Sequence, residues 1–342
     1  MKKVTGLDSL RFVCAVIVLL SHGVVPEFSE TLIEQYRIIY YLDIVQKCLR
    51  PPGLAAVMVF FVISGFVIHY PYSQGKKINV LEFYCKRVCR IGIPAIVAFC
   101  IYHFTFGLYL AVVWSLICEV IYYLLYPLIL KYKNKHMRLI LIIAFAMSYI
   151  VSVSYDIFSV GTSGAFHRYG FFLTWIVGLP VWLLGVVLAD KYKSEIAPER
   201  DHSLTHSLTH SLIKLWAWRI VTYLAASFLH RLGFFGVVSV VYTMPVFAFL
   251  VFYWVGYEIE YYKDKTENKI LEYGGLMSYS LYLVHAYTIF IVTHYSGMNK
   301  ISNDYLLCFS AIILSLFASW IFYITIEKTS HKLARSIKIK IK

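Results

Sequence analysis

The sequence predicts an all-α fold, a polytopic transmembrane bundle of about ten helices with both the N-terminus and the C-terminus in the cytoplasm. Composition is the first reason: 60% of the 342 residues are hydrophobic and 15% are charged, whereas soluble proteins are about 25% charged. The mean hydropathy is +0.68. In addition, apolar runs near the length of about 20 residues that a helix needs to cross a bilayer recur along the chain.

Hydropathy places each span, and the spans together make residues 1–342 a single integral-membrane domain. The seventh span is the weakest because Arg219 interrupts it, and almost no loop joins the third to the fourth near Gly107. The outer segment 27–53 is expected to form an amphipathic cap. The expected spans are roughly 8–26, 54–70, 91–106, 109–130, 138–154, 170–190, 213–230, 232–256, 274–295 and 304–326.

Topology explains the net charge of +13. With the N-terminus inside and ten crossings, 26 of the 32 Lys and Arg residues fall on the inner side, which is the bias of cytoplasmic loops. We therefore expect no nucleic-acid partner. The first span is not a cleaved signal peptide in this interpretation, because Asp8 and Arg11 interrupt its start and no small-residue cleavage site follows Gly23.

A short repeat occupies the inner segment 191–213. The unit His-Ser-Leu-Thr starts at residue 202, recurs at 206 and begins again at 210. A four-base unit CACT, read through successive frames, encodes these four amino acids. Our hypothesis is a tandem tetranucleotide tract in the gene, where strand slippage would shift the frame and switch the protein off and on (phase variation). A cytoplasmic loop tolerates such length changes best.

Metal binding is the alternative interpretation of the repeat, because His202, His206 and His210 would share one helix face. Metal binding does not require the Ser, Leu and Thr that repeat with these histidines. The gene sequence tests the alternative, because mixed synonymous codons across the repeats would exclude a tandem DNA tract.

The seven cysteines lie mostly in spans or on the inner face and predict no disulfide framework. Cys85 and Cys89 lack further ligands nearby, so no metal site is expected.

Arg11 and His22 are almost the only groups in the segment 10–25 that resist burial in hydrocarbon. A separation of eleven positions, at about 100° each, returns to within roughly 20° of the same helix face, and the rise is about 16 Å. An ionisable residue in a membrane helix costs roughly 2.5–3.5 kcal/mol at the bilayer centre on insertion scales, and it therefore faces protein or water. The pair predicts a polar track across the bilayer.

Two further polar groups are candidates for chemistry. Arg87 and Arg90 are neighbours on one helix face, and they are expected either to bind phosphates or to anchor the chain at lipid headgroups. Glu119 follows Trp114 and Ser115 in the fourth span, where a carboxylate must be paired or neutral. Its expected partner is His22, which it would orient as a base, or else Arg11, in a purely structural pair.

Weaker signals come from two other spans. Ser64-Gly65 interrupts the second span, and small residues there favour close helix packing. Tyr282 and His285 lie in the ninth span and are candidates for substrate contacts, although a lone histidine in a span more often makes an interhelical hydrogen bond.

Taken in order, these motifs resemble the acyltransferase-3 family, the bacterial integral-membrane acyltransferases that typically O-acetylate surface carbohydrates. Arg11 and His22 are similar to the family's Arg-x10-His motif. The resemblance covers nearly the whole chain. It continues through Phe60–Phe66, Phe83-Tyr84 with Arg87 and Arg90, Trp114-Ser115-Leu116 with Glu119, Tyr122–Pro127, Tyr279–His285, and Tyr323 to Glu327-Lys328.

The resemblance implies an acetyltransferase of the bacterial inner membrane that uses cytoplasmic acetyl-CoA, an acyl-CoA, as donor substrate and holds no bound cofactor. Arg11, Arg87 and Arg90 would bind the phosphates of the donor. His22 would be the catalytic base and Glu119 would orient it, while the weaker candidates Trp114, Ser115, Tyr282 and His285 would contact substrate. Apart from membrane lipid, the expected partner is a hydroxyl-bearing acceptor carbohydrate such as O-antigen, lipopolysaccharide, capsule or exopolysaccharide.

A glycolipid transporter or flippase is the alternative function, because it could use the same polar track for passage. Transporters more often contain inverted internal repeats with broken helices, and the two halves of this chain share no convincing repeat.

Overall fold

The computed structural model describes residues 4–106, 114–158, 169–194, 207–234, 237–263, 265, 268–297, 302 and 304–339. Within these ranges every regular element is helical, which confirms the all-α class. Seven segments there are long and apolar enough to cross a membrane, or eight if α11 (Lys269–Leu276) and α12 (Ser278–Ser296), bent by 68° at their junction, count as one span. The molecule is thus a polytopic helical membrane protein, while ten crossings and cytoplasmic termini stay predictions.

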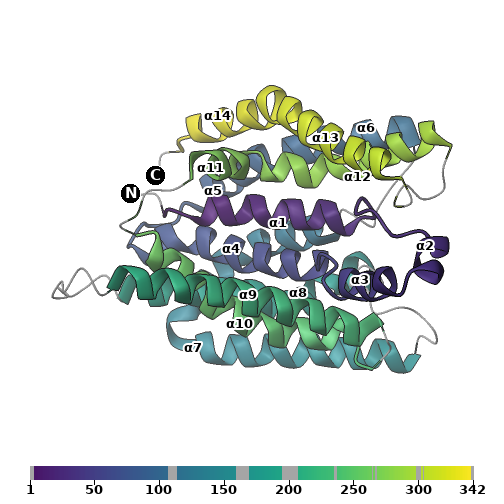
Figure 1. Ribbon diagram of the computed structural model, residues 1–342. Coiled ribbons are helices and arrows are strands. Elements are labelled where there is room, and N and C mark those ends of the chain that lie inside the picture. Colours follow the sequence, from purple (N-terminus) through teal and green to yellow (C-terminus); the bar gives the residue numbers. More distant parts are fainter. Residues whose placement is uncertain are drawn as a thin grey trace. The chain divides into compact units, whose positions relative to one another are not determined.

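The chain divides into two compact units. Unit 1 contains residues 1–7, 57–84 and 113–267, and unit 2 contains residues 8–56, 85–112 and 268–342. Helix α5 (Val80–Arg87) begins in unit 1 and ends in unit 2. The larger helices of unit 1 are most of α4 (Gly53–Ser73), then α7 (Trp114–Phe158), α8 (Gly170–Ser194), α9 (Ser207–Phe234) and α10 (Val240–Tyr261). Unit 2 holds most of α1 (Leu7–Ser21), then α2 (Glu30–Gln35), α3 (Arg37–Cys48), the π-helical turn η1 (Val88–Gly92), α6 (Ile93–Phe106), α11, α12, α13 (Tyr305–Phe322), the π-helical turn η4 (Tyr323–Glu327) and α14 (Lys328–Ser336) (Figure 1).

Helix α7 corrects the expected loop at 131–138, which is helical. Tyr122 donates a hydrogen bond to the carbonyl oxygen of Trp175 at 2.9 Å, and Ser148 donates one to that of Val177 at 3.0 Å. A straight helix would hold Tyr122 and Ser148 about 39 Å apart, yet their acceptors are neighbours on α8. Helix α7 therefore doubles back on itself, and its two arms correspond to the predicted spans 109–130 and 138–154.

Close backbone contact joins α4 to α8 in unit 1. A Cβ atom at Gly65 would lie 2.1 Å from the Trp182 carbonyl oxygen, and one at Gly185 would lie 2.0 Å from the Val62 carbonyl oxygen. Neither position has room for a side chain, so the packing role predicted for the Ser64-Gly65 pair agrees with the structure.

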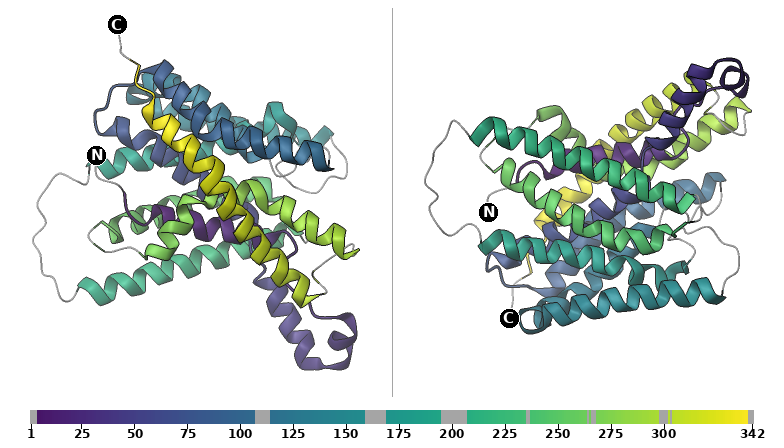
Figure 2. Two further views of the ribbon diagram at one scale, coloured as in Figure 1. Left: turned by 90° about the horizontal axis from the view of Figure 1, so that it is seen from above. Right: turned by 60° about the horizontal axis from the view of Figure 1, so that its bottom comes forward.

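Arg219 weakens the hydropathy of the seventh span. Its positive charge is balanced by the carboxylate of Glu258 on the neighbouring helix. Helices α9 and α10 run side by side (Figure 2). Arg219 binds Glu258 through Nε at 2.7 Å and through a terminal nitrogen at 3.0 Å, and Trp254 Nε1 donates to the same carboxylate at 3.0 Å. Glu258 is 1% exposed, so its carboxylate is desolvated and depends on Arg219, which is partly exposed, for charge compensation.

Replacing Arg219 with alanine is expected to destabilise the protein by about 3–5 kcal/mol, because it leaves a buried carboxylate unpaired. Unfolding of the detergent-solubilised variant by chemical denaturant measures this loss. Adding Glu258→Gln to the variant should restore much of the stability, because the unpaired charge is then gone. A double variant no more stable than Arg219→Ala would contradict this account of the ion pair.

Two boundaries differ from the prediction. Helix α1 ends at Ser21 instead of continuing to residue 26, because Gly23 adopts a left-handed backbone with φ +82°. Helix α10 begins at Val240, after Ser239, so the predicted start at 232 was too early and residues 232–234 belong to α9. The segment 27–53 contains α2 and α3, and α3 is part of the candidate membrane span Arg37–Ser73; its role as an outer cap stays a prediction. Residues 202–206 of the His-Ser-Leu-Thr repeat, and residues 107–113 at the predicted junction near Gly107, fall outside the described residues. The rest of the repeat begins α9 at Ser207 and is therefore helical, whereas a loop was expected.

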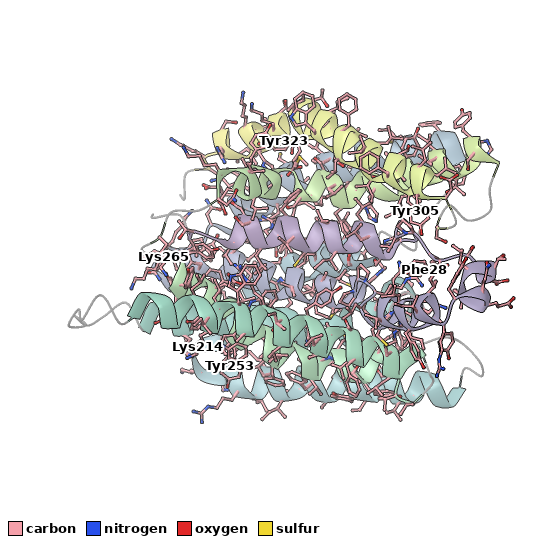
Figure 3. The ribbon with its side chains drawn as sticks, in the orientation of Figure 1. Phe28, Lys214, Tyr253, Lys265, Tyr305 and Tyr323 are labelled. Atoms are coloured by element: carbon pink, nitrogen blue, oxygen red, sulfur yellow. The ribbon has the colours of Figure 1, made fainter. Side chains whose placement is uncertain are left out.

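The C-terminal part of unit 2 is built on α12 and α13. Thr288 and Ser315 share a hydrogen bond of 2.6 Å between these helices, and both side chains are buried. Tyr305 begins α13 and Tyr323 directly follows it (Figure 3). The chain then passes through η4 into α14 without a break in the helical run (Figure 2).

Candidate active site

The predicted site residues fall in both units. Unit 1 contains Trp114, Ser115 and Glu119. Unit 2 contains Arg11, His22, Arg87, Arg90, Tyr282 and His285.

His22 stands at the end of α1, where helix geometry determines its tautomer. Its own N–H bonds to the Leu19 carbonyl at 3.1 Å, which leaves the Val18 carbonyl without its usual helical donor. The His22 Nδ1 atom lies 2.7 Å from that Val18 oxygen. Because a carbonyl oxygen only accepts, Nδ1 carries the proton and Nε2 keeps its lone pair in the neutral ring. A backbone carbonyl thus already performs the orienting role that the sequence analysis assigned to Glu119.

His285 has the same tautomer but a different environment. Its Nδ1 donates to the carbonyl oxygens of Tyr282 at 2.8 Å and Leu281 at 3.1 Å, so Nε2 again carries the lone pair. The side chain is 1% exposed, and its Nε2 has no hydrogen-bond partner among the described residues. A buried acceptor without a donor costs about 1–3 kcal/mol, so the fold retains this group at a cost.

The two imidazoles lie side by side within unit 2. Their ring centroids are 4.8 Å apart and their planes are inclined by 67°. The ring of Tyr282 lies 5.9 Å from that of His285. His22 is exposed and His285 is buried. Of the two rings only that of His22 is exposed, and a basic nitrogen at an exposed position suits the removal of a proton from a hydroxyl group.

The side chain of His331 in unit 2, which the sequence analysis did not identify, has three of the predicted site residues near it: Arg11, Arg87 and Arg90. All three guanidinium groups, together with that of Arg335, lie within electrostatic range of the His331 side chain on α14. Arg11 also lies 3.8 Å from Asp8. That Arg11, Arg87 and Arg90 form one donor site stays a prediction, and residues 331 and 335 carry no recognisable sequence signal.

Glu327 is the buried acid of this basic cluster. Its side chain is 2% exposed and accepts hydrogen bonds from the Ser280 N–H at 3.1 Å and the Ser280 hydroxyl at 2.5 Å. His331 Nε2 lies 3.5 Å from the other carboxylate oxygen. Arg90 and Glu327 belong to the two π-helical turns, η1 and η4. Such turns are frequent at functional sites.

Glu119 has its own polar cluster in unit 1. The Ser64 hydroxyl donates to its Oε1 at 2.5 Å, the Tyr123 hydroxyl donates to the same atom, and Trp182 Nε1 donates to the Ser64 oxygen at 3.2 Å. Neither Ser64 nor Tyr123 was expected to contact Glu119. The predicted pairing of Glu119 with His22, and the alternative pairing with Arg11, join residues of different units and stay predictions.

Trp114 and Ser115 begin α7, one turn before Glu119. The Trp114 ring lies 6.2 Å from that of Phe61, and Ser115 is 6% exposed. Their contact with substrate stays a prediction.

Another polar cluster of unit 1 surrounds His69, which the sequence did not single out. The fully buried ring bonds to Tyr126 through Nδ1 and to Asp190 through Nε2, both at 2.8 Å, and Lys133 also binds Asp190. Every polar atom of the ring has a partner, which is typical of a structural network. Within the described residues, no group of three or more His, Cys, Asp or Glu side chains could hold a metal ion.

The chain also matches a known protein family. The acyltransferase-3 family model, described as an acyltransferase domain, matches residues 4–324 and so covers both units. No curated protein and no solved structure matches the chain. Because the family model spans nearly the whole sequence, and the described helices include seven or eight candidate membrane spans, the chain belongs to the acyltransferase-3 family and is a multi-pass membrane acyltransferase.

Proposed function

We propose that the protein moves an acetyl group from cytoplasmic acetyl-CoA to a hydroxyl group of a cell-surface or lipid-linked carbohydrate, and that it acts in the bacterial inner membrane. The observation that carries the proposal is the content of unit 2. It combines a histidine base, whose Nε2 lone pair is available, with a cluster of arginines around His331. A thioester of a polyanionic carrier needs both groups.

The spacing along α1 suits this donor. Arg11 and His22 are separated by a rise of about 16 Å, and an extended pantetheine arm is long enough to cover it. The phosphates of acetyl-CoA would bind the arginine cluster, at the end of α1 that the charge bias predicts to be cytoplasmic. The thioester would then reach His22.

In the proposed reaction, the Nε2 lone pair of His22 takes the proton of the acceptor hydroxyl while the oxygen attacks the thioester carbonyl. The tetrahedral intermediate collapses with cleavage of the C–S bond. The proton passes from His22 to the departing sulfur, so the products are an O-acetyl ester and CoA thiol. A second hydroxyl of the acceptor would donate a hydrogen bond to the neighbouring Nε2 of His285 once a local shift of the surrounding packing opens that buried atom, and this bond would hold the acceptor against His22.

Mass analysis of the surface polysaccharide tests the proposal. Deleting the gene should remove one acetyl group from the repeating unit, and membranes containing the protein should transfer labelled acetyl from acetyl-CoA to that polysaccharide. A flippase would instead alter the amount of glycan at the surface without any dependence on acetyl-CoA. That result would overturn the proposed reaction.

Replacing Arg87 and Arg90 together with alanine is expected to raise the KM for acetyl-CoA about 10- to 100-fold, because each guanidinium–phosphate bond is charge-assisted. Lys76→Ala with Lys77→Ala is the matched control. These exposed lysines lie on the same predicted inner segment, and the control removes the same charge. Equal effects of the two double variants would assign Arg87 and Arg90 to lipid anchoring.

A further inference from the structure

Helix α14 lies beyond the residues that the family model matches, since the match ends at 324 and α14 begins at Lys328. It is nevertheless built into unit 2. The Ser330 hydroxyl donates a hydrogen bond to the Cys89 carbonyl oxygen, in the π-helical turn that also contains Arg90. Ser330 and Ala334 form the buried face of α14. The helix is therefore held against the segment that carries the predicted donor-binding arginines.

One face of the continuous helical run of η4 and α14 carries a row of ionisable residues at four-residue spacing: Glu327 of η4, then His331 and Arg335 of α14. The first two are in contact, with 3.5 Å between His331 Nε2 and Glu327 Oε1. Arg335 is one turn further and is exposed.

This row lies in a basic part of unit 2. Four guanidinium groups, those of Arg11, Arg87, Arg90 and Arg335, lie within electrostatic range of His331. Glu327 is within electrostatic range of two of them, Arg11 and Arg90, and Asp8 lies 3.8 Å from Arg11. Several guanidinium groups gathered near one side chain suit a ligand that carries several phosphates.

We propose that α14 forms part of the donor site and that Arg335 binds the ribose 3′-phosphate of CoA. The inference rests on the proposed function and deepens it. CoA carries its phosphates in two places, a diphosphate nearer the thioester and the 3′-phosphate at the far end. Arg11 lies on α1, whose other end carries His22, so Arg11, Arg87 and Arg90 face the diphosphate. Arg335, exposed and on the last turn of α14, meets the outermost phosphate.

The test compares two ligands and three proteins. The Kd of CoA and of 3′-dephospho-CoA is measured by calorimetry on the full-length protein in nanodiscs of zwitterionic lipid. The wild type is compared with Arg335→Ala and with Lys332→Ala. Lys332 is exposed on the same helix and carries the same charge, but it is outside the row of Glu327, His331 and Arg335.

Arg335→Ala should raise the Kd of CoA about tenfold, which is typical of one charge-assisted phosphate contact, and should leave the Kd of 3′-dephospho-CoA unchanged. Lys332→Ala should change neither. Equal weakening of both ligands by Arg335→Ala, or equal effects of the two variants, would overturn the assignment.

Two further results separate the explanations. If Arg335→Ala leaves CoA binding intact but releases anionic phospholipid from the purified protein, the basic row of α14 is a headgroup site and the inference is wrong while the acetyltransferase proposal stands. If the wild type binds no CoA at all, the proposed function fails together with the inference.

Discussion

Replacing His22 with alanine is expected to lower acetyl transfer by about 10²- to 10⁴-fold, the usual contribution of a general base. The variant should still insert in the membrane, because His22 follows the last residue of α1 and is exposed. Transfer of labelled acetyl from acetyl-CoA to the surface glycan, normalised to the amount of protein in the membrane, measures the loss.

Two variants separate a chemical role of His22 from a structural one. His22→Asn keeps an N–H group that can donate to the Val18 carbonyl but has no basic nitrogen, so it should be as inactive as alanine. His103→Ala removes an exposed histidine of α6 in the same unit and should retain activity. Full acetylation by His22→Ala, or recovery by His22→Asn, would show that His22 is not the base.

Replacing His285 with phenylalanine is expected to lower acetyl transfer about 10- to 100-fold without loss of stability. The ring would remain similar in size, but the buried Nε2 acceptor that lacks a partner among the described residues would be gone. Removing such a group relieves a cost of about 1–3 kcal/mol, so the melting temperature should stay constant or rise. Activity should fall because the acceptor loses its second hydrogen bond.

Opposite effects on activity and stability distinguish this role from simple packing. His285→Gln, which retains an acceptor oxygen, should recover part of the activity. His294→Phe changes an exposed histidine of the same helix and serves as the control. If His285→Phe destabilised the protein in proportion to its loss of activity, the Nε2 atom would have a structural partner and the proposed contact with the acceptor would be wrong.

Local patterns in the sequence were sufficient for the helical class and for the approximate position of most spans. Hydropathy depends on composition within a window of about 20 residues, so it needs no knowledge of distant partners. The described parts of the predicted spans 109–130 and 138–154 both lie in α7, and their count as separate crossings stays a prediction. Their continuous helical connection was missed because the polar run at 131–138 reads as a loop.

The motifs also indicated Arg11, Arg87 and Arg90, which all lie within electrostatic range of His331; their common role in donor binding stays a prediction. They could not indicate Arg335, because the sequence of a basic C-terminal helix is the same whether its arginines contact a ligand or anchor the chain at lipid headgroups. The π-helical turns that carry Arg90 and Glu327 likewise leave no periodicity that differs from an ordinary helix.

Packing between distant segments determined which side chains of different helices meet. His22 and His285 are far apart in the chain, yet their rings are 4.8 Å apart, and only the arrangement of α1 and α12 within unit 2 brings them together. The unpaired state of His285 Nε2 is equally a tertiary property, because it depends on which groups surround the atom. Arg219 shows the same principle: the sequence presents it as a break in a span, and only α10 supplies the carboxylate that makes it tolerable. Side-chain periodicity describes one helix at a time, whereas hydrogen bonds and charge compensation in a membrane protein are made between helices.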